Sequence, residues 1–257
     1  MAAATKAGAG KRPVAMITGA HVGLGKAMTL RLARDGFDII AADLSTEILS
    51  SLDGAAELKD RKLCKIAVDV RNHDSIKKAV ATALKEMGQI DVLVNNAGRQ
   101  LRAFVVDTKW EDYDDVMNIN LKGAYFLSAE VARHWLANKL PGNIVNICST
   151  HSFTGVPEGS VYGISKGGLA QMTRMMAIEW ATDNIRVNGV APATVLTPSR
   201  EILLSDPQRR QKMLERLPQK RFPTPEDIAG AVSYLANPET LAVTGHILPV
   251  DAGLLAV

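Results

Sequence analysis

The chain has 257 residues, of which 47% are hydrophobic and 22% charged, and its formal net charge at pH 7 is +3. This size and apolar content suit one α/β domain with a large core, and the weak, dispersed charge argues against nucleic acid or an acidic membrane surface as a partner. Two cysteines argue against a secreted, disulfide-built protein, and apolar runs shorter than the roughly 20 residues of a membrane span argue against a transmembrane one.

The start of the chain, residues 1–12, is rich in alanine and glycine and lacks the sustained apolar segment of a signal peptide. We therefore expect a flexible tail followed by one domain, residues 13–257, in a cytoplasmic protein. From residue 13 onward, short apolar runs alternate with longer helix-patterned segments, which is typical of βαβ units in a parallel sheet. Strands are predicted over residues 14–18, 38–42, 63–68, 90–94, 143–148, 185–190 and 246–250. Helices are predicted over residues 24–35, within 46–58, and over 75–87, 110–138, 160–183 and 225–236.

The stretch from residue 191 to residue 223 interrupts this alternation, with prolines at positions 192, 198, 207, 218 and 223 around a short helical piece. A long insertion in a compact domain is more often a substrate-binding loop than filler. Ligands of doubly wound sheets bind beyond the carboxyl ends of the strands, which is where this insertion begins. The predicted fold class is α/β, a single doubly wound domain with a seven-stranded parallel sheet and a substrate loop after the sixth strand.

A glycine-rich turn follows the first predicted strand and leads directly into a helix, with the sequence Thr18-Gly19-Ala20-His21-Val22-Gly23-Leu24-Gly25. Strand, glycine turn and helix in this order supply free backbone N–H groups and a helix dipole for a pyrophosphate. Asp43 follows the second strand at the distance typical of a carboxylate that accepts the hydroxyls of an adenosine ribose. The glycine turn alone is also compatible with an ordinary tight turn.

Polar residues follow two later strands, with Asn95-Asn96-Ala97-Gly98 after the fourth and Ser149 after the fifth. A downstream helix carries Tyr162 and Lys166, and a spacing of four puts both on one face, about 6 Å apart, so that the ammonium favours a tyrosinate. Asn120 lies three residues before Gly123 in an apolar helix. Two poor helix formers there predict a local distortion that frees a carbonyl.

Taken together, these motifs resemble the short-chain dehydrogenase/reductase family over nearly the whole chain, from about residue 13 to residue 253. The family's glycine motif is met by Thr18, Gly19, Gly23 and Gly25, and its NNAG segment is present at residues 95–98. Its active-site Asn, Ser, Tyr and Lys fall on Asn120, Ser149, Tyr162 and Lys166. Two positions depart from the family pattern, since Ala193 and Ala252 stand where the family often has glycine.

The resemblance implies a Rossmann fold, a nicotinamide cofactor and a proton exchanged between Tyr162 and a substrate hydroxyl. By the same resemblance, Ser149 holds the reacting oxygen, Lys166 supports both the tyrosine and the nicotinamide ribose, and Asn120 belongs to a proton relay. The expected cofactor contacts are Thr18, Gly19, His21, Val22, Gly23, Leu24, Gly25, Asp43, Leu44, Asp69, Val70, Asn96, Ala97, Gly98, Tyr162, Lys166, Pro192, Val195 and Thr197. The expected substrate contacts are Ser149, His151, Tyr162 and Arg99, of which His151 and Arg99 are also compatible with purely structural roles. No His, Cys or Asp cluster has metal-ligand spacing, so no metal is predicted.

The predicted cofactor is NAD, because Asp43 would repel the 2′-phosphate of NADP. In addition, Val22 and Leu44 occupy positions where NADP-using relatives usually have a basic residue. The predicted activity is hydride transfer between nicotinamide and a small secondary alcohol or ketone, such as a polyol, sugar or hydroxy acid. We expect a homo-oligomer, in particular a tetramer, since helices 110–138 and 160–183 carry more apolar residues than one buried face requires. A 3-oxoacyl reductase of lipid metabolism and a non-catalytic dinucleotide-binding sensor remain alternatives.

Overall fold

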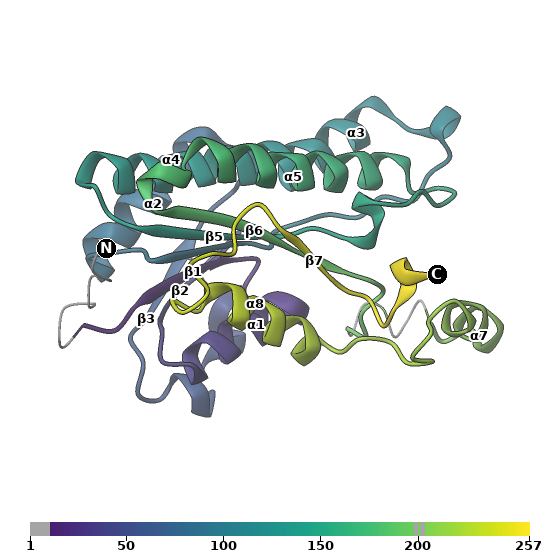
Figure 1. The fold of residues 1–257 in the computed structure, drawn as a ribbon, viewed down its shortest axis with the longest axis horizontal. Helices are drawn as coiled ribbons and strands as arrows, with labels where there is room; N and C mark the ends of the chain where they lie inside the picture. The colour runs from purple at the N-terminus through teal and green to yellow at the C-terminus, as the bar shows by residue number, and fades with distance from the viewer. Residues whose placement is uncertain (1–10, 198–199, 201–203) are drawn as a thin grey trace.

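The computed structural model describes residues 11–197, 200 and 204–257, so most of the expected N-terminal tail lies outside the described residues. Its centre is a parallel sheet of seven strands in the order β3-β2-β1-β4-β5-β6-β7 (Figure 1). The strand order reverses between β1 and β4, which is the switch point where doubly wound sheets bind their ligands. The strands are β1 Val14–Thr18, β2 Asp38–Asp43, β3 Leu63–Ala67, β4 Val92–Asn95, β5 Gly142–Ile147, β6 Ile185–Pro192 and β7 Ile247–Val250.

The central strands are buried on both faces, as their continuous apolar character predicts. Every residue of β1, β4, β5 and β6 is buried. Parallel sheets are stable in this setting because crossover helices cover both of their faces. All seven predicted strands are confirmed, and their ends differ from the prediction by at most two residues.

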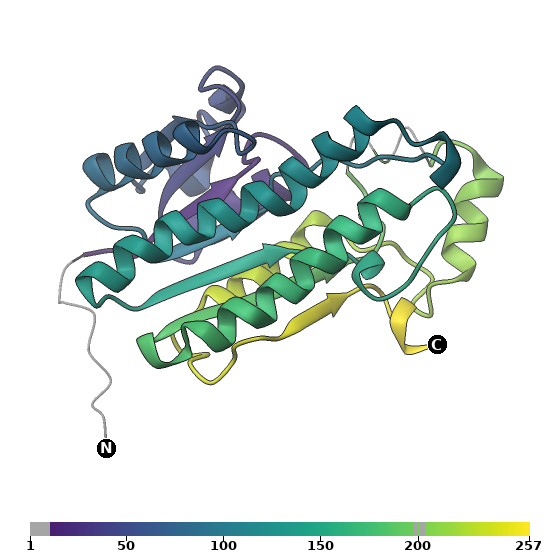
Figure 2. The same ribbon diagram turned by 90° about the horizontal axis from the view of Figure 1, so that it is seen from above.

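Two layers of helices enclose the sheet (Figures 1 and 2). One face is covered by α2 His73–Met87, α4 Ala124–Asn138 and α5 Ser160–Glu179, whose apolar side chains form one continuous core with the sheet. The other face is covered by α1 Gly23–Arg34 and α8 Pro225–Ala236, which share a second core. Trp135 of α4 is fully buried and donates its indole N–H to the Ile90 carbonyl at 2.6 Å. This bond holds α4 against the segment that leads into β4. None of the helices in the described part of the chain has the length and apolar character needed to cross a membrane.

Three predicted helices differ in detail from the structure. The region within residues 46–58 forms short 3₁₀ turns, Ile48–Leu52 and Ala56–Leu58, because Gly54 between them takes a left-handed φ of +74° that ends the helical path. The segment 110–138 is divided into α3 Trp110–Met117, a π-helical stretch Asn118–Gly123 and α4. The segment 160–183 is α-helical only to Glu179 and closes with a 3₁₀ turn.

The insertion after β6 has a small apolar core of its own. Leu204, Leu217 and Phe222 are buried together with Ala252, and α7 Pro207–Glu215 lies along the outside, beyond the carboxyl ends of the strands (Figure 1). Asp206 caps α7 by accepting the Gln208 N–H at 3.0 Å. The insertion is therefore a structured wall at the edge of the sheet where ligands bind.

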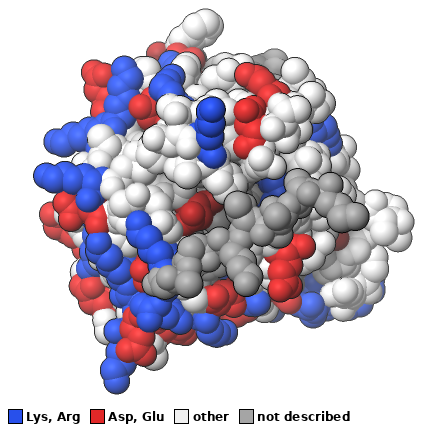
Figure 3. Space-filling view, turned by 60° about the vertical axis from the view of Figure 1, so that its left-hand side comes forward, with Lys and Arg blue, Asp and Glu red and all other residues white. Residues whose placement is uncertain are grey.

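Positive and negative side chains lie close together on the face drawn in Figure 3, where Lys and Arg are interspersed with Asp and Glu along the left and lower edges. Ion pairs of the surface include Arg34 with Glu57 at 3.2 Å. This mixture agrees with the small net charge of +3.

Gly25→Ala tests the close approach of α1 to the preceding turn. A Cβ at Gly25 would lie 1.8 Å from the Gly19 carbonyl oxygen, so we expect the variant to lose about 1–3 kcal/mol of unfolding free energy. The matched control is Gly230→Ala in α8, whose Cβ would meet only the end of the Arg31 side chain at 3.6 Å. Helix propensity predicts that this control is stabilised by up to about 1 kcal/mol. Urea unfolding in which both variants behave alike would contradict the packing argument.

Candidate active site

The glycine turn after β1 and the NNAG turn after β4 are joined by four hydrogen bonds across the switch point. The Thr18 hydroxyl accepts the backbone N–H groups of Asn96 and Ala97, each at 3.0 Å. In return, the Asn96 side-chain amide donates to the carbonyls of Thr18 at 2.8 Å and Gly19 at 3.2 Å. Thr18 is buried, so its hydroxyl holds the two turns together and is not presented to a ligand.

The glycine turn leaves the start of α1 open. Gly19 and Gly23 have left-handed φ values of +65° and +55°, and Val22, at the N-cap, has no side-chain acceptor for the first amides of the helix. These amides and the helix dipole form the type of site that binds a phosphate group. Thr197 of the insertion lies close by, since a Cβ at Gly23 would be 3.5 Å from its methyl group.

At the end of β2, the carboxylate of Asp43 lies beside the glycine turn, as the sequence predicts, but it also contacts a histidine. One oxygen is 2.8 Å from Nδ1 of His21 and 3.2 Å from the His21 backbone N–H. The other oxygen accepts the Leu44 N–H at 2.9 Å. The side chains of Val22 and Leu44, 48% and 64% exposed, leave this end of the groove without a Lys or Arg at either position.

Asp69 is paired within the protein, which the sequence did not predict. Its carboxylate accepts from the Arg71 guanidinium at 2.9 Å, and this hydrogen bond is the main reason why the pKa of Asp69 lies below its ordinary value. Arg71 also pairs with Asp115 of α3 at 3.0 Å. The neighbouring Val70 is buried and packs against Gly123, where a Cβ would lie 2.7 Å from the Val70 carbonyl.

Tyr162 and Lys166 occupy one face of α5, as their spacing predicts. The Lys166 ammonium lies 5.8 Å from the centre of the Tyr162 ring and donates to the Ile147 carbonyl at 2.6 Å. Only 4% of Lys166 is exposed, and no carboxylate among the described residues pairs with it. Because a buried ammonium is costly unless polar atoms surround it, this site is built to receive oxygen atoms.

Ser149 and His151 complete the polar side of the site. The Ser149 hydroxyl oxygen accepts the His151 backbone N–H at 3.2 Å and lies 3.1 Å from Nδ1 of the ring. That ring meets the Tyr162 ring edge-on at 5.5 Å. Burial, with added repulsion from Arg200, lowers the pKa of His151 below its ordinary value, so the imidazole is neutral at neutral pH.

Asn120 connects the NNAG loop to α5 and is almost fully buried. Its carbonyl accepts the Arg99 N–H at 2.7 Å, and its amide donates to the Arg99 carbonyl at 2.9 Å and to the Ser165 hydroxyl at 3.0 Å. It lies in the π-helical stretch Asn118–Gly123, so the local distortion predicted from Asn120 and Gly123 is present. The sequence did not indicate that the side chain itself would clamp the loop.

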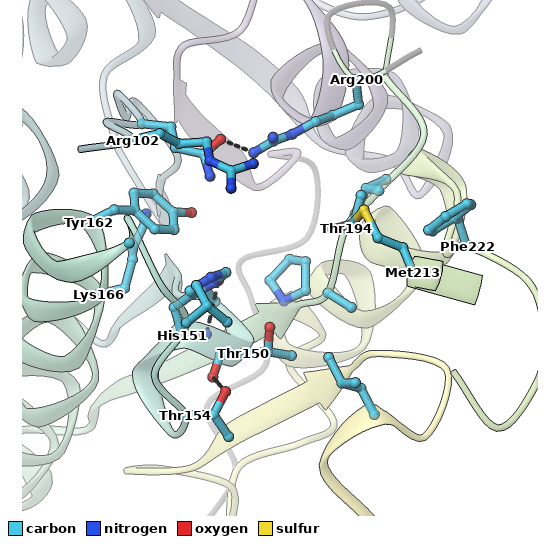
Figure 4. A pocket seen from close by; sticks show the side chains of 18 of the residues that line it. Arg102, Thr150, His151, Thr154, Tyr162, Lys166, Thr194, Arg200, Met213 and Phe222 are labelled. Carbon is cyan, nitrogen blue, oxygen red and sulfur yellow. Dashed lines mark hydrogen bonds between the residues drawn. The ribbon is translucent and has the colours of Figure 1, made fainter. Parts of the chain in front are cut away.

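A cavity of about 780 Å³ opens at the carboxyl ends of β4, β5 and β6 (Figure 4). Eleven of the expected site residues line it: Leu24, Asn96, Gly98, Arg99, Ser149, His151, Tyr162, Lys166, Pro192, Val195 and Thr197. The remaining expected residues are outside the lining set: Thr18, Gly19, His21, Val22, Gly23, Gly25, Asp43, Leu44, Asp69, Val70, Ala97 and Asn120. The structure thus gathers Ser149, Tyr162 and Lys166 around one cavity, whereas Asn120 and Asp43 lie outside its lining.

Arg99, which was expected to contact the substrate, pairs with carboxylates of α3. The Arg99 guanidinium pairs with Asp112 at 3.2 Å and with Asp115, both on α3. Its charge is therefore neutralised at the exposed edge of the site, and we do not assign it to the substrate.

Four basic lining residues were not singled out from the sequence: Arg200, Arg209, Lys212 and Arg216. Arg200 reaches Gln100, a residue 100 positions away, and no local pattern signals such a contact. Arg102 pairs with Glu158 at 2.8 Å. The prolines of the insertion indicated that a loop lies here, but not which of its side chains face the cavity.

A glycine turn at the switch point of a doubly wound sheet, with Ser149, Tyr162 and Lys166 gathered beyond β5, defines the class of short-chain dehydrogenases/reductases. A family model described as enoyl-(acyl carrier protein) reductase matches residues 19–255. The chain therefore belongs to the short-chain dehydrogenase/reductase family.

Its relatives include enzymes of different substrate classes. The chain is 38% identical over 243 residues to a 2-dehydro-3-deoxy-D-gluconate 5-dehydrogenase of Escherichia coli (strain K12), covering 95% of each. It is 41% identical over 243 residues to a 3-oxoacyl-(acyl-carrier-protein) reductase of Thermotoga maritima, covering 94% of this chain and 97% of that protein. A solved structure from Agrobacterium tumefaciens, assigned as a 2-deoxy-D-gluconate 3-dehydrogenase with bound NADP, matches with a TM-score of 0.88 at 34% identity, covering 96% of this chain and 98% of that one.

Proposed function

We propose that this protein is an NAD(H)-dependent oxidoreductase that transfers a hydride between nicotinamide and a secondary alcohol or ketone, with Tyr162 as the general acid and base. The observation that carries the proposal is the buried ammonium of Lys166, which lacks a carboxylate partner in the described chain and lies 5.8 Å from the Tyr162 ring. The names of two relatives, both dehydrogenases of gluconate derivatives, support a CH–OH substrate.

The residues present fit a dinucleotide. The backbone around Gly19 and Gly25 is too crowded for a Cβ, and the first amides of α1 lack a side-chain cap, as a phosphate cradle requires. In the proposal, the glycine turn holds the pyrophosphate, Asp43 the adenosine ribose, Lys166 the nicotinamide ribose, and Val195 with Thr197 the carboxamide. When bound, the cofactor accepts or supplies the hydride.

The chain itself handles the proton. A phenol is a weak base at neutral pH unless a nearby cation stabilises its anion, and Lys166 supplies that cation to Tyr162. In the oxidation direction the Tyr162 hydroxyl oxygen takes the proton of the substrate hydroxyl. Ser149 holds the same substrate oxygen, and the neutral His151 ring beside it fixes the serine hydroxyl.

We also propose a homo-oligomer, as the family resemblance implies, and specifically a tetramer. The outward faces of α4 and α5 support it, since they expose Tyr125, Phe126, Ile164, Met175 and Ile178, with Ile178 77% exposed. The two helices lie side by side on one face of the molecule (Figures 1 and 2). Apolar area of this kind on neighbouring helices is typical of an interface between subunits.

Two alternative functions predict different results in activity assays. A 3-oxoacyl reductase, the activity named for the Thermotoga maritima relative, would reduce an acetoacetyl thioester faster than it oxidises any small alcohol. A non-catalytic sensor would bind the dinucleotide but turn over no member of an alcohol panel. The complete set of Asn120, Ser149, Tyr162 and Lys166 favours an enzyme.

Tyr162→Phe tests the role of the phenol. We expect a loss of turnover of about 10²–10⁴-fold with nearly unchanged binding of the dinucleotide, because the change removes the transferable proton but little contact area. Steady-state rates and calorimetric binding measure the two effects. Tyr234→Phe, on the exposed face of α8, is the matched control and should keep wild-type values. A Tyr162→Phe enzyme with more than about a tenth of wild-type turnover would overturn the assignment.

The preference for NAD is tested by a two-residue exchange. A 2′-phosphate about 5 Å from the Asp43 carboxylate is opposed by roughly 3 kcal/mol per charge pair, which is tenfold or more in affinity even when half screened. We therefore expect wild-type kcat/KM to favour NAD, and Asp43→Ala combined with Leu44→Arg to shift it toward NADP.

His21→Gln is the control for this exchange, because it removes the ring that contacts Asp43 but keeps the carboxylate, and it should still favour NAD. A wild-type enzyme that favours NADP, as the bound cofactor of the Agrobacterium tumefaciens relative permits, would refute the preference.

A further inference from the structure

The walls of the active-site cavity are strongly cationic. Seven basic residues line it, whereas only two acidic residues, Glu158 and Asp206, do so. The basic residues are Arg99, Arg102, Lys166, Arg200, Arg209, Lys212 and Arg216. This excess contrasts with the mixed charges on the outer face of Figure 3 and with the net charge of only +3 for the whole chain.

The three arginines nearest the reacting groups differ in whether a carboxylate already neutralises them. Arg99 is neutralised by carboxylates of α3, and Arg102 donates from two nitrogens to one oxygen of Glu158, at 3.1 and 2.8 Å. Arg200 differs, because its guanidinium bonds to the neutral amide oxygen of Gln100 and no carboxylate of the described chain pairs with it.

Arg200 lies where it can reach a substrate. Its guanidinium projects from the insertion across the cavity toward Arg102, on the side to which the Tyr162 hydroxyl points (Figure 4). It is partly buried, and burial lowers its pKa, although a guanidinium remains charged throughout the ordinary pH range. Arg102 and Tyr162 are both near enough to act on this charge.

Arg200 has no anionic partner among the described residues, whereas Arg102 has Glu158. The opposite wall does not supply one, because His151 is neutral there and Ser149 is uncharged. A planar guanidinium with a neutral partner is matched best by a carboxylate, which accepts two parallel hydrogen bonds from it. With Arg102 paired to Glu158, Arg200 is the guanidinium on this side of the cavity that can still take a carboxylate.

We propose that the substrate is a hydroxy acid of the sugar-acid class and that Arg200 binds its carboxylate, exchanging Gln100 for the substrate while Tyr162 faces the reacting hydroxyl. This deepens, and rests on, the function proposed above. Arg209, Lys212 and Arg216 also line the cavity and form no ion pair with a described residue, so they raise the local concentration of anions. Arg200 is therefore a specificity-determining residue.

The test compares D-gluconate with D-glucitol, which share a carbon chain and differ in having a carboxylate or a hydroxymethyl group at one end. We expect wild-type kcat/KM with NAD to favour D-gluconate by at least about tenfold. Arg200→Gln should lower that ratio by at least about tenfold, mainly through KM. Arg210→Gln, which stands on α7 outside the cavity lining and stacks on Phe222, is the matched control and should leave the ratio unchanged.

A binding measurement separates this inference from the function on which it rests. In the Tyr162→Phe background, calorimetry with saturating NAD should show D-gluconate bound more tightly than D-glucitol, and Arg200→Gln should abolish the difference. If wild type oxidises neutral alcohols as well as acids and Arg200→Gln affects both equally, the carboxylate site is wrong although the proposed function stands.

Two further substrates test other assignments of the cavity. D-glucitol 6-phosphate preferred over D-gluconate by tenfold would assign the site to phosphate, and an acetoacetyl thioester turned over faster than either acid would assign the cavity to acyl substrates. Either result overturns the proposal. If none of these compounds is turned over with either cofactor, the proposed function itself fails.

Discussion

The hydrogen bonds between the glycine turn and the NNAG turn are the constraint on which the rest of the site depends. Thr18 and Asn96 join the ends of β1 and β4 at the point where the strand order reverses. Losing a buried hydrogen bond of this kind and leaving its partner unpaired costs about 1–3 kcal/mol. The bonds fix both where α1 begins and where the loop from Gly98 to Arg102 leaves the sheet, so the start of α1 and this loop are positioned together.

Asn120 connects the same two turns to the residues proposed to transfer the proton. Its side chain holds the backbone of Arg99 on one side and the Ser165 hydroxyl of α5 on the other. Tyr162 and Lys166 are on that helix, and Lys166 is anchored to β5 through the Ile147 carbonyl. A buried ammonium held in place before any ligand arrives is preorganised, so the proposed mechanism needs little reorganisation when charge develops on the phenol.

Local sequence patterns predicted those features whose causes are local. The parallel strands followed from continuous apolar runs, the shared face of Tyr162 and Lys166 from a spacing of four, and the distorted helix at Asn120 from two poor helix formers. The helix expected within residues 46–58 failed because a left-handed glycine outweighed the apolar pattern around it.

Contacts between distant segments could not be predicted in this way. The His21 ring on Asp43, the pairing of Asp69 with Arg71, and the direction of the Arg99 side chain toward α3 depend on how loops fold back in space. Arg200 is the clearest case, because its partner Gln100 lies 100 residues away and its charge matters only in the assembled cavity. The family motifs indicated where the proposed chemistry would occur, whereas the proposal about the substrate's charge rests on the three-dimensional arrangement.

The central claim is that this site transfers a hydride from a carbon-bound hydrogen of the substrate to nicotinamide. It is tested most directly by incubating the 257-residue protein with NAD and D-gluconate deuterated at every carbon-bound position, and analysing the reduced cofactor by mass spectrometry. Deuterated D-glucitol is tested in parallel. The account predicts one deuterium in each molecule of reduced cofactor formed, and more labelled cofactor from the acid than from the polyol. Reduced cofactor without deuterium, or no reduction of NAD or NADP by either compound, would contradict it.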